Sequence, residues 1–341
     1  MKPLRTIEII GGGLAGLSLG LALRLAGAPV TIYEVGHYPR HRVCGEFITG
    51  LSSATIARLS LGPLLHDALR HHQVTWFMDG RRGRTQRLPS PALALSRHLL
   101  DARLAKAFTD SGGQLITGTR IAGRTTDEGC VIATGRRRAE SPWIGLKIHA
   151  RNLPLVCDLE LHLGEEAYIG LTRVENGCVN VCGLFRRREL AAKGPALILA
   201  YLQATKLWAL AERLGGAAFD LDSFSAVAAV GFDRQVPDTG PGVMLGDAGA
   251  MIPPFTGNGM AMAFQSAECA LDPLLAYTQH NADWTATCHS ICTALQHRFR
   301  LRLAVADLLH PFLLQPSRQR WLQRLARTHL LPLGPLYSML H

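Results

Sequence analysis

The stretch that decides the fold is "TIEIIGGGLAGLSLGLALRLAGAPVTIYE", residues 6–34. The β-branched and apolar residues at 6–10 predict a short buried strand, and a run of glycines follows them. Residues 17–25 continue as an apolar helix that ends at Gly27, and residues 30–33 form a second strand. The stretch is therefore a strand, a glycine turn, a helix and a strand.

The glycines of this turn have the spacing G-x-G-x-x-G. Gly11 allows the tight turn, Gly13 lets a diphosphate approach the backbone, and Gly16 lets the helix pack closely on the strand. The N-terminus of the helix offers free N–H groups and a partial positive charge to an anion. Glu34 ends the second strand, where a carboxylate can bind ribose hydroxyls. The stretch predicts a dinucleotide site, and the acid at position 34 favours FAD or NAD over NADP.

A second unit, "GVMLGDAGAMIPPFTGNGMAMAFQSAECALDPLL" at 242–275, favours FAD over NAD. It begins with a short strand at 243–245 and ends in a helix from about Gly259. Between them, Asp247 can accept hydrogen bonds from the hydroxyls of a sugar-like chain. Gly257 and Gly259 let backbone N–H groups face a flat ring, and the helix dipole favours negative charge on that ring. This suits the anionic edge of a reduced flavin, for which NAD has no counterpart.

With both units in place, residues 5–290 resemble the FAD-dependent oxidoreductases that include geranylgeranyl reductases and the aromatic hydroxylases related to p-hydroxybenzoate hydroxylase. "LSRHLLDARLAKAFTDSGGQL" at 95–115 resembles the family segment whose arginine, here Arg97, lies near the flavin diphosphate. An ordinary solvated arginine on a helix is the alternative. "CVIATGR" at 130–136 resembles a family strand that ends in Ala-Asp-Gly, but Thr134 replaces the aspartate and only Gly135 keeps its role in the turn.

Motifs and resemblance together predict the set of residues that bind FAD. The set comprises Gly11, Gly13, Leu14, Ala15, Gly16, Glu34, Arg42, Arg97, Gly135, Gly246, Asp247, Pro254, Gly257, Asn258, Gly259 and Met260.

The predicted fold is α/β, with a Rossmann-like FAD-binding domain of the glutathione-reductase and p-hydroxybenzoate hydroxylase type. Alternating polar and apolar residues with turn signals, from 142 to 185, predict an antiparallel β-sheet with hairpins, and the resemblance implies that this sheet is an inserted substrate domain. The segment 188–215 is predicted to be helical. The domain ranges are 1–55, 90–140 and 235–290 for the discontinuous FAD-binding domain, 56–89 and 141–234 for the substrate domain, and 291–341 for a C-terminal helical segment.

The composition narrows the class of protein. The chain has 341 residues, of which 48% are apolar and 18% charged, and this indicates a globular protein. It has no zinc-finger spacing, no aromatic RNA-binding signature and no C-x-x-C among its eight cysteines, so we expect neither a nucleic-acid partner nor a metal site. With no signal peptide and no apolar stretch long enough to span a bilayer, we expect a cytoplasmic protein with reduced thiols.

The net charge of +10 is concentrated near the end of the chain, because residues 291–341 hold seven arginines and one acid. Arg320, Arg324 and Arg327 recur at helical spacing beside Trp321. The segment can form a basic amphipathic helix on a membrane surface, or a helix packed on the domain with its arginines in water. Arginine clusters at 81–84, 136–138 and 186–188 are expected to coat loops and hairpin ends, with an anion site as the alternative.

The segment "YPRHRVCGEFITG", residues 38–50, supplies candidate catalytic residues. In a Rossmann-like fold the chain leads from the second strand toward the flavin ring, and geranylgeranyl reductases are similar here, with Cys-Gly-Glu after Pro-Arg. The resemblance gives Cys44 and Glu46 a role in protonating a carbon after hydride transfer, and Lys147 is a third candidate. The alternatives are a small buried Cys44, a Glu46 paired with Arg40 or Arg42, and a surface Lys147.

Two enzymatic functions remain open from the sequence. The first is flavin-mediated reduction of a C=C bond in a lipophilic, isoprenoid or polyketide-like substrate, which the Cys-Gly-Glu resemblance favours. The second is flavin-dependent hydroxylation of an aromatic or polyketide substrate, and a non-catalytic FAD-binding protein is a further alternative. No second glycine motif for a nicotinamide cofactor is present, so NAD(P)H would bind transiently or an external reductase would deliver the electrons.

Overall fold

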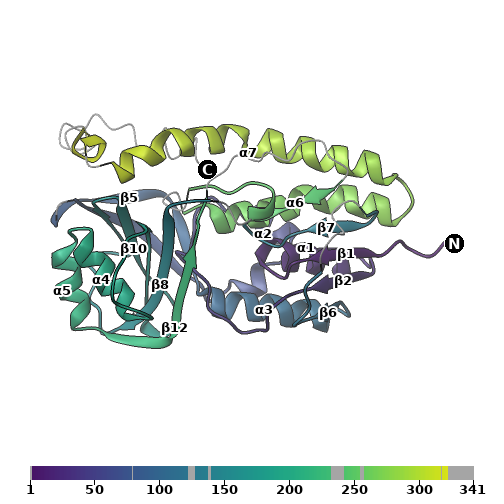
Figure 1. The fold of residues 1–341 in the computed structure, drawn as a ribbon. Helices are drawn as coiled ribbons and strands as arrows, with labels where there is room; N and C mark the ends of the chain where they lie inside the picture. Colours follow the sequence, from purple (N-terminus) through teal and green to yellow (C-terminus); the bar gives the residue numbers. More distant parts are fainter. Residues whose placement is uncertain are drawn as a thin grey trace.

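The protein is built on two sheets that lie side by side, with one long helix lying across both (Figure 1). The computed structural model describes residues 2–78, 80–121, 127–136, 140–231, 242–253, 257–315 and 317–321.

The first sheet has five parallel strands in the order β13-β7-β1-β2-β6. Its strands are β1 (Ile7–Ile10), β2 (Val30–Tyr33), β6 (Gln114–Ile116), β7 (Cys130–Ile132) and β13 (Val243–Met244). Helix α1 (Leu14–Leu25) packs against both α3 (Arg97–Asp110) and α6 (Gly259–Thr278). Gly16 makes the approach of α1 to β1 possible, because a Cβ atom there would lie 2.0 Å from the Gly11 carbonyl oxygen.

The second sheet has eight strands in the order β12-β8-β11-β10-β9-β4-β5-β3, and all its pairings are antiparallel except β4 with β9. Its strands are β3 (Phe47–Ile48), β4 (Leu69–Met78), β5 (Arg81–Ala94), β8 (Trp143–Arg151), β9 (Leu159–Gly164), β10 (Ala167–Arg173), β11 (Val179–Arg186) and β12 (Ala218–Ala228). Helices α4 (Ala196–Ala204) and α5 (Trp208–Gly215) bury apolar side chains against one face of this sheet.

Helix α7 (Trp284–Leu314) joins the two halves. Its first part packs along α6, and its last turns contact β9 and β10 of the second sheet. Figure 1 shows it as the long helix that runs over the whole molecule. The short helix α2 (Ser53–Arg58) lies between β3 and β4 in the chain and contacts α6.

The predicted fold class is confirmed, since a parallel α/β unit carries an inserted, mainly antiparallel sheet and C-terminal helices. The helical segment expected at 188–215 contains α4 and α5. One detail differs from the expected antiparallel sheet: β4 joins it parallel to β9, a pairing that the long stretch of chain between these strands allows. The C-terminal helix α7 begins at Trp284, where the side chain of Asp283 caps it. The predicted domain ranges stay a prediction.

Candidate functional site

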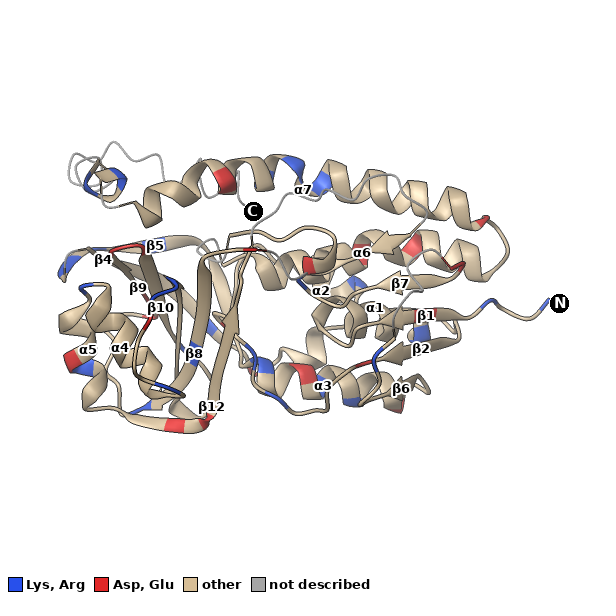
Figure 2. Ribbon diagram, viewed as in Figure 1, with Lys and Arg blue, Asp and Glu red and all other residues tan. Residues whose placement is uncertain are grey.

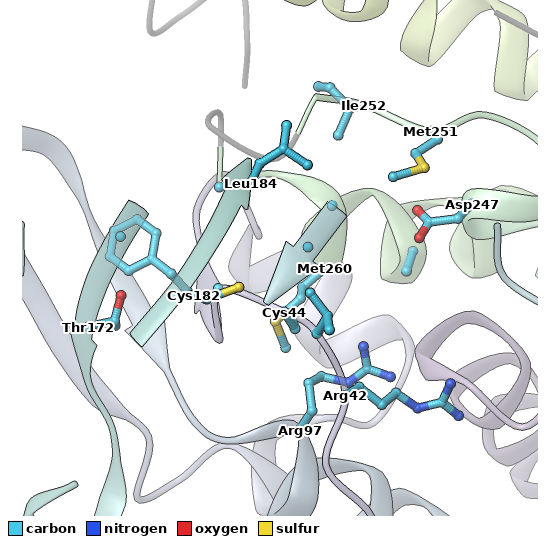
Figure 3. Close-up of a pocket in the computed structure, with 18 of the residues that line it drawn as sticks. Arg42, Cys44, Arg97, Thr172, Cys182, Leu184, Asp247, Met251, Ile252 and Met260 are labelled. Carbon is cyan, nitrogen blue, oxygen red and sulfur yellow. The ribbon is translucent and has the colours of Figure 1, made fainter. Parts of the chain in front are cut away.

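The carboxyl ends of four parallel strands, β1, β2, β7 and β13, lead into one cavity of about 1680 Å³. In open α/β sheets this edge is where ligands bind. The opposite wall of the cavity comes from the second sheet and from the last turns of α7. Figure 3 shows the region in which the two walls meet, with Asp247 on one side and Thr172 and Cys182 on the other.

The turn after β1 has the geometry that its glycines predict. Gly11 has φ +112°, and a Cβ atom there would lie 2.3 Å from the Ala133 carbonyl oxygen, so only glycine fits. Gly13 precedes α1 without a side-chain cap, and a Cβ atom there would meet no other atom within 4 Å. The first N–H groups of α1 therefore face the cavity with room in front of them, and this positive helix end suits a diphosphate.

Glu34 follows β2 and lines the same cavity, although it is only 4% exposed. One carboxylate oxygen accepts hydrogen bonds from Arg40 at 2.6 Å and from the Gly36 N–H at 2.9 Å, and the other accepts from the Gly12 N–H at 2.7 Å. Burial alone would raise the pKa of Glu34, but these hydrogen bonds and the charges of Arg40 and Arg42 lower it. The carboxylate is therefore held ionised at the cavity wall.

Arg97 and Arg42 are joined by a buried acid. Arg97 is the first residue of α3, and its guanidinium donates to both oxygens of Asp101, at 2.7 and 2.8 Å. Arg42 donates to the same carboxylate at 3.2 Å. Asp101 is fully buried, whereas both arginines line the cavity. Pairing with Asp101 holds the two guanidinium groups at the cavity wall, where they could bind a diphosphate. Arg97 is therefore not a freely solvated helix residue.

The second glycine unit forms the facing part of the cavity. Gly246 and Asp247 follow β13, and α6 begins at Gly259, where an added Cβ atom would again meet nothing within 4 Å. The Asp247 carboxylate reaches solvent through the cavity, yet the surrounding protein raises its pKa, against the opposing charges of Arg97 and Arg136. The N-termini of α1 and α6 thus open on the same space.

The structure gathers most of the predicted FAD-binding residues around this cavity. Those that line it are Gly11, Gly13, Leu14, Ala15, Glu34, Arg42, Arg97, Gly135, Gly246, Asp247, Gly257, Gly259 and Met260. Gly16 and Asn258 do not line it: Gly16 serves helix packing, and buried Asn258 accepts a 2.6 Å hydrogen bond from Thr49. Pro254 lies outside the described residues. The FAD-binding role of the whole set stays a prediction.

The far part of the cavity is mainly apolar. Its wall comes from β4, β9, β10 and β11 of the second sheet and from α7, and it includes Trp76, Leu161, Leu163, Tyr168, Leu184 and Phe312. A large apolar pocket beside a few polar groups suits a lipophilic small molecule.

Cys44 is the one of the three predicted catalytic residues that lines the cavity. It lies beside Cys182 of β11, which lines the same wall (Figure 3). Burial raises the pKa of the Cys44 thiol, although the nearby Arg97 opposes this effect. Burial and the neighbouring Cys44 also raise the pKa of Cys182. Both thiols therefore keep their protons at neutral pH.

Glu46 and Lys147 are fully buried and form a sealed cluster behind Cys44. Glu46 accepts hydrogen bonds from His149 Nε2 at 2.6 Å and from the Arg97 N–H at 3.0 Å, and its carboxylate lies 3.5 Å from Lys147 Nζ. Lys147 Nζ in turn lies 3.0 Å from His41 Nδ1. The partners of Glu46 are therefore neither Arg40 nor Arg42, and Lys147 is not a surface lysine.

The pKa of Glu46 is shifted in the opposite direction from the pKa of Cys44. Burial would raise this pKa, but the hydrogen bond from His149 and the charge of Lys147 outweigh burial and lower it. Glu46 is therefore an ionised acceptor, with no proton of its own to donate at neutral pH. Burial and the charge of Lys147 also lower the pKa of His41, to about 4, so His41 is neutral.

Two residues of the site escaped the sequence analysis. Asp101 stands four residues after Arg97 in a predicted helix, and this i, i+4 spacing was a usable signal for an ion pair. Cys182 gave no such signal, because its position beside Cys44 depends on how β11 meets a loop that is distant in the sequence.

Comparison with curated proteins gives a partial match. No family model matches the chain. It is 26% identical over 133 residues to a menaquinone reductase of Mycolicibacterium smegmatis and 28% identical over 120 residues to one of Mycobacterium tuberculosis. These matches cover 37% and 33% of this chain, and the chain spans about a third of the length of each relative, 32% and 29%.

Comparison with solved structures covers nearly the whole chain. PqsL, a probable FAD-dependent monooxygenase from Pseudomonas aeruginosa, aligns with a TM-score of 0.72 at 16% identity, over 94% of this chain and 99% of its own. The p-nitrophenol 4-monooxygenase of Pseudomonas putida aligns with a TM-score of 0.75 at 12% identity, over 100% and 97% of the two chains. A flavin-dependent brominase gives 0.74 at 16% identity, over 99% and 93%. The chain therefore has the fold of the FAD-dependent monooxygenases and halogenases related to p-hydroxybenzoate hydroxylase.

Proposed function

We propose that this protein is an FAD-dependent oxidoreductase that reduces a C=C bond of a lipophilic small molecule. The observation that carries the proposal is the single cavity, which joins two glycine turns and two helix N-termini to an apolar pocket, with a protonated thiol on its wall. A cofactor and a substrate can meet in such a space without crossing bulk water.

The residues present fit FAD. The open backbone at Gly13 and the N-terminus of α1 would hold the diphosphate, with Arg42 and Arg97 beside it. Glu34 would bind the ribose next to the adenine, and Asp247 the ribityl chain. The N-terminus of α6 would favour negative charge on the ring system. When bound and reduced by the electron donor, FAD would supply hydride to one carbon of the double bond.

Cys44 is the proton donor in this proposal. Reduction of a C=C bond requires a hydride on one carbon and a proton on the other, and Cys44 Sγ holds a proton at the cavity wall. Glu46 cannot take this role while it is ionised. Instead, it fixes Lys147, His149 and the backbone of Arg97 behind the thiol. Glu46 and Lys147 are then positioning residues.

The source of electrons is NAD(P)H, bound transiently, or a separate reductase. The sequence has no second glycine motif that would hold a nicotinamide dinucleotide permanently. The name of the curated relatives, menaquinone reductase, supports reduction rather than oxygen insertion.

A second candidate is flavin-dependent hydroxylation. The names of the solved structures with this fold favour it, since they include a probable monooxygenase and a p-nitrophenol monooxygenase. A cavity thiol weighs against it, because Cys44 beside an oxygen-activating centre would itself be open to oxidation.

One anaerobic experiment separates the two candidates. The purified protein, once its flavin has been identified in a denatured extract, is reduced with dithionite and mixed without oxygen with a prenylated naphthoquinone or a prenyl alcohol. We expect the flavin to be reoxidised and the product to keep two added hydrogens after exposure to air, which returns any quinol to the quinone but leaves a reduced C=C bond unchanged. A flavin that stays reduced until oxygen is admitted, with a product that gains one oxygen atom, would establish hydroxylation instead. An extract with NAD and no flavin would contradict both candidates.

A further inference from the structure

We propose that the arginine-rich β4–β5 hairpin and the end of α7 form one docking surface for an anionic lipid bilayer, placed where the apolar part of the cavity opens. The proposed function enters only through the lipophilic nature of the substrate. The surface consists of Arg81, Arg82, Arg84 and Arg87 on β5, Leu308 on α7, and Arg318, Arg320 and Trp321 after it.

The β5 arginines differ from those arginines of the protein that have a carboxylate partner. Arg81, Arg82, Arg84 and Arg87 are exposed and line the cavity. Within the described parts of the chain, no carboxylate forms an ion pair with any of them. Elsewhere, Arg40, Arg58, Arg97 and Arg103 each have a carboxylate partner. Four arginines without a carboxylate partner among the described residues create a positive potential at the cavity wall, which attracts anions from outside the chain.

The end of α7 adds apolar and aromatic groups beside these cations. Leu308 is 70% exposed and Trp321 is 51% exposed. The Trp321 ring lies 5.6 Å from the ring of Phe312, and Phe312 lines the cavity together with its neighbour Leu313. The exposed Trp321 therefore lies directly against Phe312, a residue of the cavity wall.

The segment after α7 is fixed in place on the second sheet. Buried Gln319 donates to the Gly164 carbonyl at 2.9 Å and to the Leu313 carbonyl at 2.6 Å. Its neighbours Arg318 and Arg320 remain exposed. In Figure 2 the blue-coloured short segment beyond α7 and the blue-coloured outer end of β4 and β5 appear at the same end of the molecule.

Two arginines of the C-terminal segment 291–341 are already engaged within the protein and are not available to a membrane. Arg298 pairs with Glu268 at 2.7 Å, and Arg302 is 7% exposed and donates to Gln265 at 2.7 Å. Arg324 and Arg327 lie outside the described residues. Among the described residues the basic surface is therefore a composite of two distant segments, and the helical stripe of Arg320, Arg324 and Arg327 stays a prediction.

Anionic lipid is the partner that this chemistry fits. Arginines near a bilayer surface bind lipid phosphates, and tryptophan prefers the level of the headgroups. Among the described residues no helix is long and apolar enough to cross a membrane, so the contact would be a surface contact. A cavity that opens onto the lipid would let a lipophilic substrate enter without the cost of exposure to water.

Vesicle co-sedimentation of the purified full chain tests the surface without any turnover, so its outcome does not depend on the proposed reaction. The probes are phosphatidylcholine vesicles with and without about one third phosphatidylglycerol, an anionic fraction large enough for basic residues to respond to the surface potential. We expect binding to the anionic vesicles only. Substituting Arg81, Arg82, Arg84 and Arg87 by Gln should lower the partition coefficient at least about tenfold at low salt, and Trp321→Ala should lower it by a smaller factor.

A matched variant controls for net charge. Gln at Lys2, Arg70, Arg151 and Lys193, which are exposed residues away from the hairpin tip, removes the same four charges and should leave binding within about threefold of the original. Equal losses in the two variants, or hairpin variants that bind like the original protein, would overturn the proposal. Capture of an acidic ferredoxin by the hairpin arginines, without vesicle binding, would also overturn it and assign the surface to an electron donor.

Discussion

Two buried carboxylates lie twelve residues apart in the chain, and the regions around them are built differently. The Glu34 region, at the end of β2, borders the cavity and combines backbone N–H donors with Arg40, whose side chain is 27% exposed. Glu46, just before β3, does not line the cavity although its neighbours do, and its carboxylate and the Lys147 ammonium are both fully buried.

This difference separates groups that can serve a ligand from groups that serve the fold. At Glu34 the arginine partners can turn toward solvent, so the carboxylate can exchange hydrogen bonds with a ribose at small cost. At Glu46 no partner can leave without exposing a bare charge to the protein interior. The surroundings of each acid, rather than the residue type, therefore decide its role.

The largest effect is expected at the sealed region. Lys147→Met leaves the ionised Glu46 without its buried cation, so the free energy of unfolding should fall by about 3 to 5 kcal/mol. Urea denaturation of the purified protein measures this loss. A fall below about 1 kcal/mol would show that His149 and the Arg97 N–H suffice for Glu46 and that the cluster is not sealed.

The double variant Lys147→Met with Glu46→Gln is the control for this prediction. It removes both charges, while the carbonyl oxygen of the new amide side chain can still accept the hydrogen bond from the Arg97 N–H. Because the uncompensated charge is gone, we expect it to be more stable than Lys147→Met alone by about 1 to 3 kcal/mol.

The two regions also differ in what the sequence could predict. Around Glu34 the information is local: β2 spans Val30–Tyr33 as expected, α6 begins at Gly259 as expected, and Gly11 has the positive φ that its turn requires. A glycine pattern fixes such geometry over a few residues, so it can be recognised without knowing the rest of the fold.

Around Glu46 the information is distributed over the chain. His149 is 103 residues from Glu46, and Lys147 is 106 residues from His41. Nothing within the segment "WIGLK" distinguishes a buried lysine from an exposed one. In the same way, the sequence does not predict the 14-residue strand β5, because Pro89, Pro91 and four arginines conceal a strand whose pairing with β4 depends on the neighbouring sheet.

A smaller effect is expected at the open region. Glu34→Gln removes the charge that pairs with Arg40 and would weaken the bond to a ribose hydroxyl, at a cost of about 1.5 to 3 kcal/mol in cofactor binding. The dissociation constant for FAD, measured by titration of the apoprotein, should therefore rise about 10- to 100-fold. Asp272→Asn, which alters an exposed pair with Arg58, should leave it unchanged. Unchanged affinity in Glu34→Gln would mean that the open carboxylate serves only the fold.

Cys44 lies between the two regions. Its substitution is expected to change the free energy of unfolding least and the rate of substrate reduction most. Cys44→Ser keeps the size of the side chain, and the bond from Asn180 to the Cys44 carbonyl is a backbone contact that survives. We expect the free energy of unfolding to change by less than about 1 kcal/mol and FAD affinity to stay within about threefold. Loss of a proton donor should nevertheless slow anaerobic reoxidation of the reduced protein by substrate, by about 100-fold or more.

Cys182→Ser is the matched control for Cys44→Ser, because Cys182 lines the same wall and its thiol also keeps its proton. The proposed mechanism gives the proton transfer to Cys44 alone, so Cys182→Ser should turn over within a few-fold of the original protein. If both variants turned over equally slowly, the cause would be the changed shape or polarity of the cavity wall rather than the loss of a proton donor. Rapid turnover in Cys44→Ser together with slow turnover in Glu46→Gln would reverse the comparison, since the sealed cluster would then deliver the proton and the thiol would only shape the pocket.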